Sequence, residues 1–428
     1  MLIYISVVLL FAASFAGILA GKAHRVIFAM AGAVLMVLLG ITLDFYSQEE
    51  ALLAIDFNTL GLLFGMMVIV VILKNTGYFE YIAILTAKRT KGNPWILLVS
   101  LGTITTVASL FLDNVTTVIL MAPVTVLIAG ILGISPIPLL MAEAFLSDTG
   151  GVATLVGDPP NILIGSAANL SFMDFVVNLA PIVLAAWLAT LILIRLLFRE
   201  ELAQKPSNLE ALQALDEHEA LKDRTSANKV LVILVGVAAL FFLHQSLHMQ
   251  AGFVALIGAA AALFWLRPDL EDIMEGIEWP VLLFFAALFV VVGGIEASGL
   301  LDLAGESLTG LSSQDVILMG VALIWVAAVA SALIDNIPFT IAMIPIIQAL
   351  ARPGLDITPL WWALALGAGF GGNATPIGST ANMVVVSLSE KTKHPITSRI
   401  WLRSGIPIMI ATCAVATILY VVRFGILE

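Results

Sequence analysis

An Asp-Asn pair occurs twice in this chain, each time inside a strongly apolar stretch. The first copy lies in FLDNVTTVILMAP at 111–123 and the second in DNIPFTIAMIP at 335–345. Asp, Asn and Thr are short side chains that hydrogen-bond local backbone and still present oxygen atoms outward. They suit the tip of a helical hairpin that faces an ion or a polar solute inside the membrane, where hydrocarbon satisfies no backbone group. A helix N-cap without a ligand would explain a single copy, whereas two copies favour binding.

A second repeated pattern, GGVATLVGDPPN at 150–161 and GGNATPIGSTAN at 371–382, predicts a broken helix in each half of the chain. Paired glycines loosen the helix, and Pro159-Pro160 and Pro376 remove backbone donors and stop it. Unwound carbonyl groups can hold a cation, and the N-termini of half-helices attract negative groups. Kinked helices with a purely structural role are the alternative.

Three acids of the first half, Glu143, Asp148 and Asp158, have no acidic counterpart in the second half, and no Lys, Arg or His occurs between Gly92 and Ile194. Acids without a counter-charge predict a cation, a proton or a neutral polyol as cargo. A carboxylate withdrawn from water binds a proton more readily, which suits proton coupling. Asp148, which directly precedes the first break, is the first candidate for that role, followed by Asp158 and then Glu143.

The composition indicates that these residues lie within a membrane. The chain has 428 residues, of which 61% are hydrophobic and 11% charged, and its mean hydropathy is +1.08. A soluble protein carries roughly twice that share of charge. The single cysteine, Cys413, excludes a disulfide within the chain and a site of several thiolates for a soft metal or arsenic. We expect an all-α polytopic protein whose first apolar run is a retained helix, not a signal peptide, with crossings near 2–20, 26–43, 57–74, 137–169, 174–198, 228–247, 250–266, 279–298, 358–389 and 401–424.

The two halves of the chain repeat each other. AIDFNTLGLLF at 54–64 matches GIEWPVLLFFA at 276–286, and the two Asp-Asn pairs lie at the same spacing of 222 residues. If each Asp-Asn stretch is a re-entrant hairpin, each half crosses the membrane five times, and an odd number inverts the second half relative to the first. Seven crossings in each half would also invert it.

The predicted organisation is therefore two inverted five-crossing repeats, each with a re-entrant hairpin and a broken helix. Residues 1–198 form the first repeat, with a cytoplasm-facing hairpin at 94–133 and a broken helix at 137–169. Residues 199–227 form a cytoplasmic linker, in which Ser207 and Glu210 predict a capping box. Residues 228–428 form the second repeat, with an exterior-facing hairpin at 315–351 and a broken helix at 358–389. We expect the two hairpin tips to meet beside the breaks.

The basic residues orient this layout. Of the 19 Lys and Arg residues, all except Arg352 and Arg423 fall on one side of it. The positive-inside rule makes that side cytoplasmic. The prediction is a multi-pass protein of the inner (plasma) membrane with both termini outside the cytoplasm.

At these motifs the sequence resembles the ion transporter superfamily, and in particular arsenite permeases of the ArsB type, NhaD-type sodium/proton carriers and the melanosomal P protein. The resemblance rests on FLDNVTTVILMAP, SDTGGVATLVGDPPNILIG, SALIDNIPFTIAMIP and GGNATPIGSTANMVV. It implies a scaffold and a transport part that slides across it in the manner of an elevator. The solute-binding residues that it implies are Asp113, Asn114, Thr116, Thr117, Thr154, Gly157, Asp158, Asn161, Asp335, Asn336, Thr340, Asn373, Thr375, Gly378, Ser379 and Asn382.

The leading functional hypothesis is proton-coupled efflux of arsenite and antimonite, with a sodium/proton antiporter as the closest alternative. A dicarboxylate or citrate carrier comes third, because dicarboxylate carriers of this superfamily have Ser-Asn-Thr at the hairpin tips where this chain has Asp-Asn. An intramembrane aspartyl protease needs a Tyr-Asp pair that the chain lacks, so we expect a transporter and no enzyme. The expected partners are the solute, protons and lipid, with a homodimer and, for an arsenite type, a cytoplasmic ATPase subunit left open. No cofactor, metal or nucleic acid is expected.

Overall fold

The computed structural model describes residues 2–20, 24–300, 303, 315–351 and 355–426, and it confirms an all-helical, polytopic membrane architecture. Residues 1, 21–23, 301–302, 304–314, 352–354 and 427–428, Arg352 among them, lie outside the described part. Within the described part, eight stretches are helical, long and apolar enough to cross a membrane: Arg25–Leu43, Phe57–Asn75, Asn114–Leu132, Phe172–Leu197, Arg224–Leu243, Trp279–Ala297, Val316–Leu333 and Ser398–Ile426.

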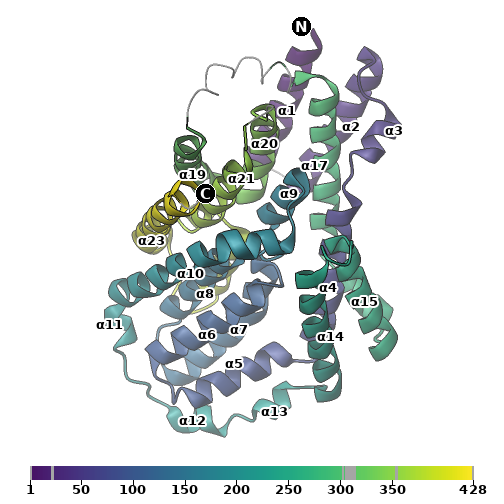
Figure 1. Ribbon diagram of the computed structural model, residues 1–428. Coiled ribbons are helices and arrows are strands. Elements are labelled where there is room, and N and C mark those ends of the chain that lie inside the picture. The colour runs from purple at the N-terminus through teal and green to yellow at the C-terminus, as the bar shows by residue number, and fades with distance from the viewer. Residues whose placement is uncertain (1, 21–23, 301–302, 304–314, 352–354, 427–428) are drawn as a thin grey trace.

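Six helices form a column along one side of the molecule (Figure 1), which we call the scaffold. The scaffold consists of two groups of three helices. In the first group, three helices pack against one another: α1 (Leu2–Ala20), α2 (Arg25–Leu43) and α17 (Trp279–Ala297). The other group consists of α4 (Phe57–Asn75), α14 (Arg224–Leu243) and α15 (Ala251–Leu266). The short helices α3 (Gln48–Leu53) and α16 (Leu270–Gly276) connect scaffold helices. Helix α5 (Tyr78–Arg89) leads from α4 to the remaining helices, which we call the hairpin bundle.

The hairpin bundle contains both Asp-Asn motifs, each at a turn between two antiparallel helices. The first hairpin is α6 (Pro94–Ser109) and α7 (Asn114–Leu132), and the second is α19 (Val316–Leu333) and α20 (Asn336–Ala349). Asp113 is the N-cap of α7, where its Oδ1 accepts a bond of 2.9 Å from the Thr116 backbone N–H. Asp335 occupies the same position before α20 but forms no capping bond. The two tips are therefore equivalent in sequence and different in chemistry.

Each predicted break separates two half-helices, α8 (Ile137–Gly151) from α9 (Pro159–Ala168) and α21 (Thr358–Gly372) from α22 (Thr380–Glu390). One asparagine holds each break. The Asn161 amide donates to the carbonyl oxygens of Val152 (3.0 Å) and Thr154 (2.8 Å). The Asn382 amide donates to those of Gly372 (2.9 Å) and Thr375 (3.0 Å). The bonds to Val152, Thr154 and Gly372 satisfy carbonyl groups that the unwound chain would otherwise leave without a donor, while Thr375 O also accepts from Gly378 N (3.3 Å).

Each break also packs closely on its own hairpin. The hydroxyl of Thr154 donates to Leu110 O (2.6 Å), and that of Thr375 donates to Ala332 O (2.5 Å). A Cβ on Gly157 would lie 2.5 Å from a backbone oxygen of the first hairpin, so this contact admits glycine only. The remaining helices of the bundle are α10 (Phe172–Leu197), α23 (Ser398–Tyr420) and the π-helical end Val421–Ile426.

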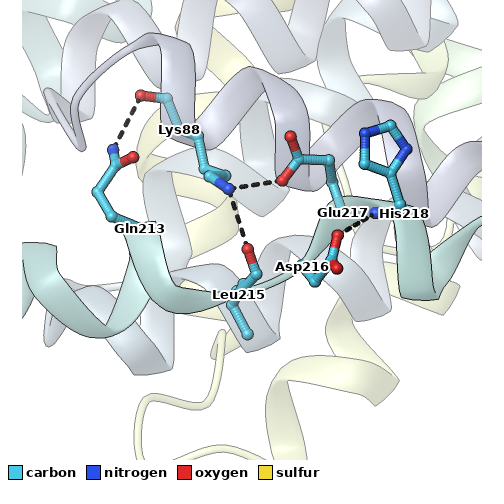
Figure 2. A network of polar contacts seen from close by, with 6 residues as sticks. All are labelled: Lys88, Gln213, Leu215, Asp216, Glu217 and His218. Atoms are coloured by element: carbon cyan, nitrogen blue, oxygen red, sulfur yellow. Dashed lines mark hydrogen bonds and ion pairs between the residues drawn. The ribbon is translucent and has the colours of Figure 1, made fainter.

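The segment between the halves is docked against α5 and α7. It contains α11 (Arg199–Leu202), α12 (Leu209–Ala214) and α13 (Glu217–Ala220). Figure 2 shows the Lys88 ammonium between the Glu217 carboxylate (2.5 Å) and the carbonyl of Leu215 (2.9 Å). The hydrogen bond from this ammonium lowers the pKa of the Glu217 carboxyl below its usual value. Gln213 donates from the other side to the Lys88 carbonyl (3.3 Å).

The predicted capping box in this segment is wrong. Asn208, not Ser207, is the N-cap of α12, and the Ser207 hydroxyl instead donates to the carbonyl of Leu132 (3.1 Å) at the end of α7. Helix α14 begins at Arg224, earlier than expected, because Asp223 caps it by accepting from Ser226 N (3.0 Å).

We predict that Asn161→Ala and Asn382→Ala each destabilise the fold. Asn161→Ala removes the amide donor of the Val152 and Thr154 carbonyls, and Asn382→Ala removes that of the Gly372 carbonyl, whereas Thr375 O keeps its bond from Gly378 N. One unsatisfied buried group costs about 1–3 kcal/mol. Thermal unfolding in detergent should show a clearly lowered midpoint for both variants. The control is Asn208→Ala, which removes an exposed cap in the linker and should have a much smaller effect. Equal midpoints for all three variants would contradict the role assigned to the breaks.

The sidedness of the fold is a separate prediction. A cysteine at Leu2, in a chain whose buried Cys413 is replaced by alanine, should react with an impermeant thiol reagent on intact cells, because the basic residues place the N-terminus outside. A cysteine at the exposed Lys222 should react only after lysis. The reverse pattern would overturn the orientation.

Candidate solute-binding site

Both hairpin tips and the second break line one small cavity of about 40 Å³. The tips contribute Asp113, Asn114 and Asn336, and the break contributes Ser379 and Thr380. A cavity of that measure has room for roughly three water molecules. The structure thus brings predicted residues from both halves of the chain to one place.

Asp148 joins the first hairpin to the second break. Its Oδ1 accepts from the Asn114 amide (2.8 Å) and from the Ser379 hydroxyl (3.1 Å). Its Oδ2 is buried and has no hydrogen-bond partner among the described residues. The carboxyl group is therefore held in place by one oxygen, while the other is available to a proton or a ligand.

Asp158 makes the reciprocal connection from the first break to the second hairpin. Asp158 occupies the N-cap position of α9, but its side chain forms no capping hydrogen bond. Its Oδ1 instead accepts from the Asn336 amide (3.3 Å). A further bond between the halves runs from the Asn373 amide to the Thr149 hydroxyl (3.1 Å). Asp148 and Asp158 thus each receive a donor from the other half.

The tip of the first hairpin contacts the scaffold through an acid that the sequence did not single out. The Thr116 hydroxyl donates to Asp113 Oδ2 (2.5 Å) and lies 3.3 Å from Glu278 Oε1, at the start of α17. One hydroxyl hydrogen cannot satisfy both carboxylates, which repel each other unless a proton or cation lies near them. Glu278 was detectable as the repeat partner of Asp56 in the matched segments at 54–64 and 276–286. Asp56 likewise contacts the hairpin bundle, through the hydroxyl of Ser166.

The second hairpin tip is paired with a cation, so the expectation of acids without a counter-charge is wrong for Asp335. The Arg25 guanidinium, at the start of α2, lies 2.6 Å from Asp335 Oδ2 and 5.1 Å from the ring centre of Phe284. Thr380 also donates to Asp335 (3.3 Å). Sequence reasoning missed this pair because it considered basic residues near the motifs along the chain, and Arg25 comes from a distant helix.

Several other predicted residues use their polar groups within the fold. The hydroxyls of Thr117 and Thr340 donate to carbonyls one turn earlier in their own helices, those of Asp113 (3.0 Å) and Asn336 (2.9 Å). Thr154, Thr375, Asn161 and Asn382 hold the breaks, as described above, and Gly157 and Gly378 allow close backbone packing. In the described part of the chain, buried side-chain oxygens without a partner are left on Asn161, Asn373 and Asn382.

Glu143 lies apart from the cavity. Its Oε1 accepts from the Thr125 hydroxyl of α7 (2.5 Å), and its fully buried Oε2 finds no partner among the described residues. In the described part of the chain, no group of three or more His, Cys, Asp or Glu side chains is placed to hold a metal ion.

Comparison with known proteins identifies the chain. The family model described as CitMHS, citrate transporter, matches residues 15–367. A 46 kDa membrane protein of Mycobacterium leprae is 38% identical over 424 residues, which cover 98% of each chain. The human P protein is 32% identical over 473 residues, which cover 92% of this chain and 56% of that protein.

A solved structure shares the fold. The crystal structure of the YdaH transporter of Alcanivorax borkumensis matches with a TM-score of 0.63 at 15% identity, and the match covers 94% of this chain and 99% of that chain. An uncharacterized transporter of Mycobacterium tuberculosis is 38% identical over 428 residues. The resemblance inferred from the motifs is confirmed: this chain is a multi-pass membrane transporter that belongs to the CitMHS citrate transporter family of the ion transporter superfamily.

Proposed function

We propose that this chain is a secondary transporter for a small solute that carries no negative charge, with proton-coupled efflux of arsenite and antimonite across the inner membrane as its activity. The observation that carries the proposal is the charge of the site. Asp113 and Glu278 line the cavity of about 40 Å³. Asp148, Asp158 and Asp335 lie behind this lining and each forms hydrogen bonds to residues of it. Among the described lining residues the cationic side chain is Arg25, which is already paired with Asp335.

This charge disfavours citrate, although the family description names it. A multiply charged anion needs cationic partners to replace its water, and here it would meet acids. Arsenous acid is neutral near pH 7 and has three hydroxyl groups, which can hydrogen-bond to carboxylate and amide oxygens without a thiolate. Its size also suits a cavity with room for roughly three water molecules.

Sodium/proton exchange is the second candidate, and the unpartnered oxygens favour it. Asp148 Oδ2, Asp335 Oδ1 and the side-chain oxygens of Asn161, Asn373 and Asn382 are buried without hydrogen-bond partners in the described part of the chain. Hard cations prefer such oxygen ligands. In this version of the mechanism, Na⁺ and the proton compete for the same carboxyl groups.

We further propose that the hairpin bundle moves against the scaffold to expose this site to either side. The inverted repeats at 1–198 and 228–428 and the two different tips support this arrangement. Single hydrogen bonds and one ion pair connect the hairpin bundle to the scaffold, and each can break and form again during a movement. They join Thr116 to Glu278, Ser166 to Asp56, and Asp335 to Arg25.

Asp148 is the proposed proton-coupling residue, and Asp148→Asn tests it. The amide keeps the size of the side chain and an oxygen acceptor for Asn114, but it cannot exchange a proton. We expect concentrative, proton-driven transport in proteoliposomes to fall by at least about tenfold while downhill exchange continues. Asp272→Asn, an exposed acid on α16, is the control. Unchanged pH dependence in Asp148→Asn would make Asp148 a structural residue.

The cargo can be tested with everted membrane vesicles under an imposed proton gradient. We expect arsenite and antimonite to accumulate, since a neutral polyol enters an acidic site without a charge penalty. Parallel measurements with sodium and with citrate decide between the candidates. Sodium movement alone would select the second candidate, and citrate uptake alone would refute the argument from charge.

A further inference from the structure

We propose that Arg25 is a counter-ion fixed to the scaffold that holds the hairpin bundle in the present arrangement until Asp335 takes up a proton or a cargo cation. The inference rests on the proposed movement of the bundle, and it assigns to one ion pair the coupling between that movement and cation uptake. Arg25 is thus a positioning residue that acts through Asp335.

The two charges belong to different bodies. Arg25 is the first residue of α2, which packs against α1 and α17 in the scaffold. Asp335 lies at the tip of the second hairpin, whose helices pack on α21 and α9 in the bundle. The contact of 2.6 Å between Nη1 and Oδ2 therefore bridges the boundary along which movement would occur.

The Arg25–Asp335 ion pair is partly withdrawn from water. The Arg25 side chain is 25% exposed and that of Asp335 is 17% exposed. The guanidinium lies over Phe284 at 5.1 Å, which fixes it from the scaffold side. Asp335 Oδ1 is buried and has no partner in the described residues, so this oxygen can accept a proton or contact a cation while the pair is still in place.

Other charges near Asp335 make it dependent on Arg25. Asp148 on α8 and Asp158 at the start of α9 are both within electrostatic reach of Asp335. Asp113 on the first hairpin tip and Glu278, the N-cap of α17, line the cavity together with Arg25, and Arg25 and Lys74 of α4 act on Glu278. Asp148 and Asp158 therefore oppose an ionised Asp335, and Arg25 is the cation in direct contact with it.

The direction of the effect follows from this geometry. While Asp335 is ionised, leaving Arg25 would place an uncompensated charge in a partly buried site, which is strongly unfavourable. A proton or a bound cation neutralises Asp335 and removes that penalty, so the bundle is free to move. Where the cargo is a cation, as in sodium/proton exchange, Arg25 thereby suppresses movement of the empty, deprotonated carrier, a movement that would waste the proton gradient.

The test measures movement directly and needs no cargo. Spin labels are attached at Leu53→Cys on α3 and Leu184→Cys on α10, side chains that are 84% and 60% exposed, in a full-length Cys413→Ala chain in lipid nanodiscs. Distances between the labels are measured in mildly acidic and mildly alkaline buffer. For the otherwise native chain we expect one distance in alkaline buffer and a second population in acid.

Arg25→Gln should raise the second population in alkaline buffer by about tenfold or more, because the pair no longer holds the bundle. Arg25→Lys should restore the native pH response, and Asp335→Asn should show both populations in both buffers. Arg195→Gln, which removes an arginine stacked on Trp95 (5.0 Å), is the matched control and should behave as the native chain.

Three results would overturn the inference: a native chain whose distance is independent of pH, an Arg25→Gln chain that responds as the native one does, or an Asp335→Asn chain that keeps the pH response. The outcome is separable from the cargo proposal. Vesicles that fail to accumulate arsenite while Arg25→Gln abolishes the pH response would refute the cargo and leave the ion pair in its role.

Discussion

Hydrocarbon offers no hydrogen-bond partner to an interrupted helix, and the arrangement of the hairpin bundle follows from that constraint. Two tips and two breaks free backbone groups inside a membrane protein, and they satisfy one another instead. Asn161 and Asn382 bond the carbonyls of their own breaks, while Thr154 and Thr375 bond the ends of α6 and α19. The polar site exists because these irregular segments had to be buried together.

Because the tips and breaks are buried, the charge of the candidate site is the main determinant of which solute we expect it to bind. Asp148 and Asp158 each keep one oxygen bonded to a donor from the other half, so that their positions are fixed while their protonation is not. The scaffold adds Glu278 and Arg25, which lie at the tips without belonging to the bundle. If the hairpin bundle moves against the scaffold as proposed, the charge around the tips changes with the position of Glu278 and Arg25.

Periodicity and repetition in the sequence predicted the helices, the hairpin turns and the breaks, because hydrophobic length, Gly-Gly and Pro-Pro act locally. They also led to the superfamily, since its motifs fall at those irregular segments. Long-range pairing was not predictable. Nothing near Arg25 in the chain indicates Asp335, and Ser207 has the spacing of a capping residue yet bonds Leu132. The difference between the Asp113 and Asp335 tips depends on such tertiary contacts, so two equivalent motifs acquired different partners.

The hydrogen bonds between the halves have a consequence for biosynthesis. Asp158 receives its donor from a residue 178 positions later, and Asp148 receives one from 231 positions later. When the ribosome has completed only the first repeat, both carboxyl groups are already in the membrane and both lack these donors. The first half therefore cannot reach its final packing during its own insertion. Until the second half arrives these acids can be solvated by water or neutralised by a proton, and the bonds from Asn336 and Ser379 form only after translation has passed those residues.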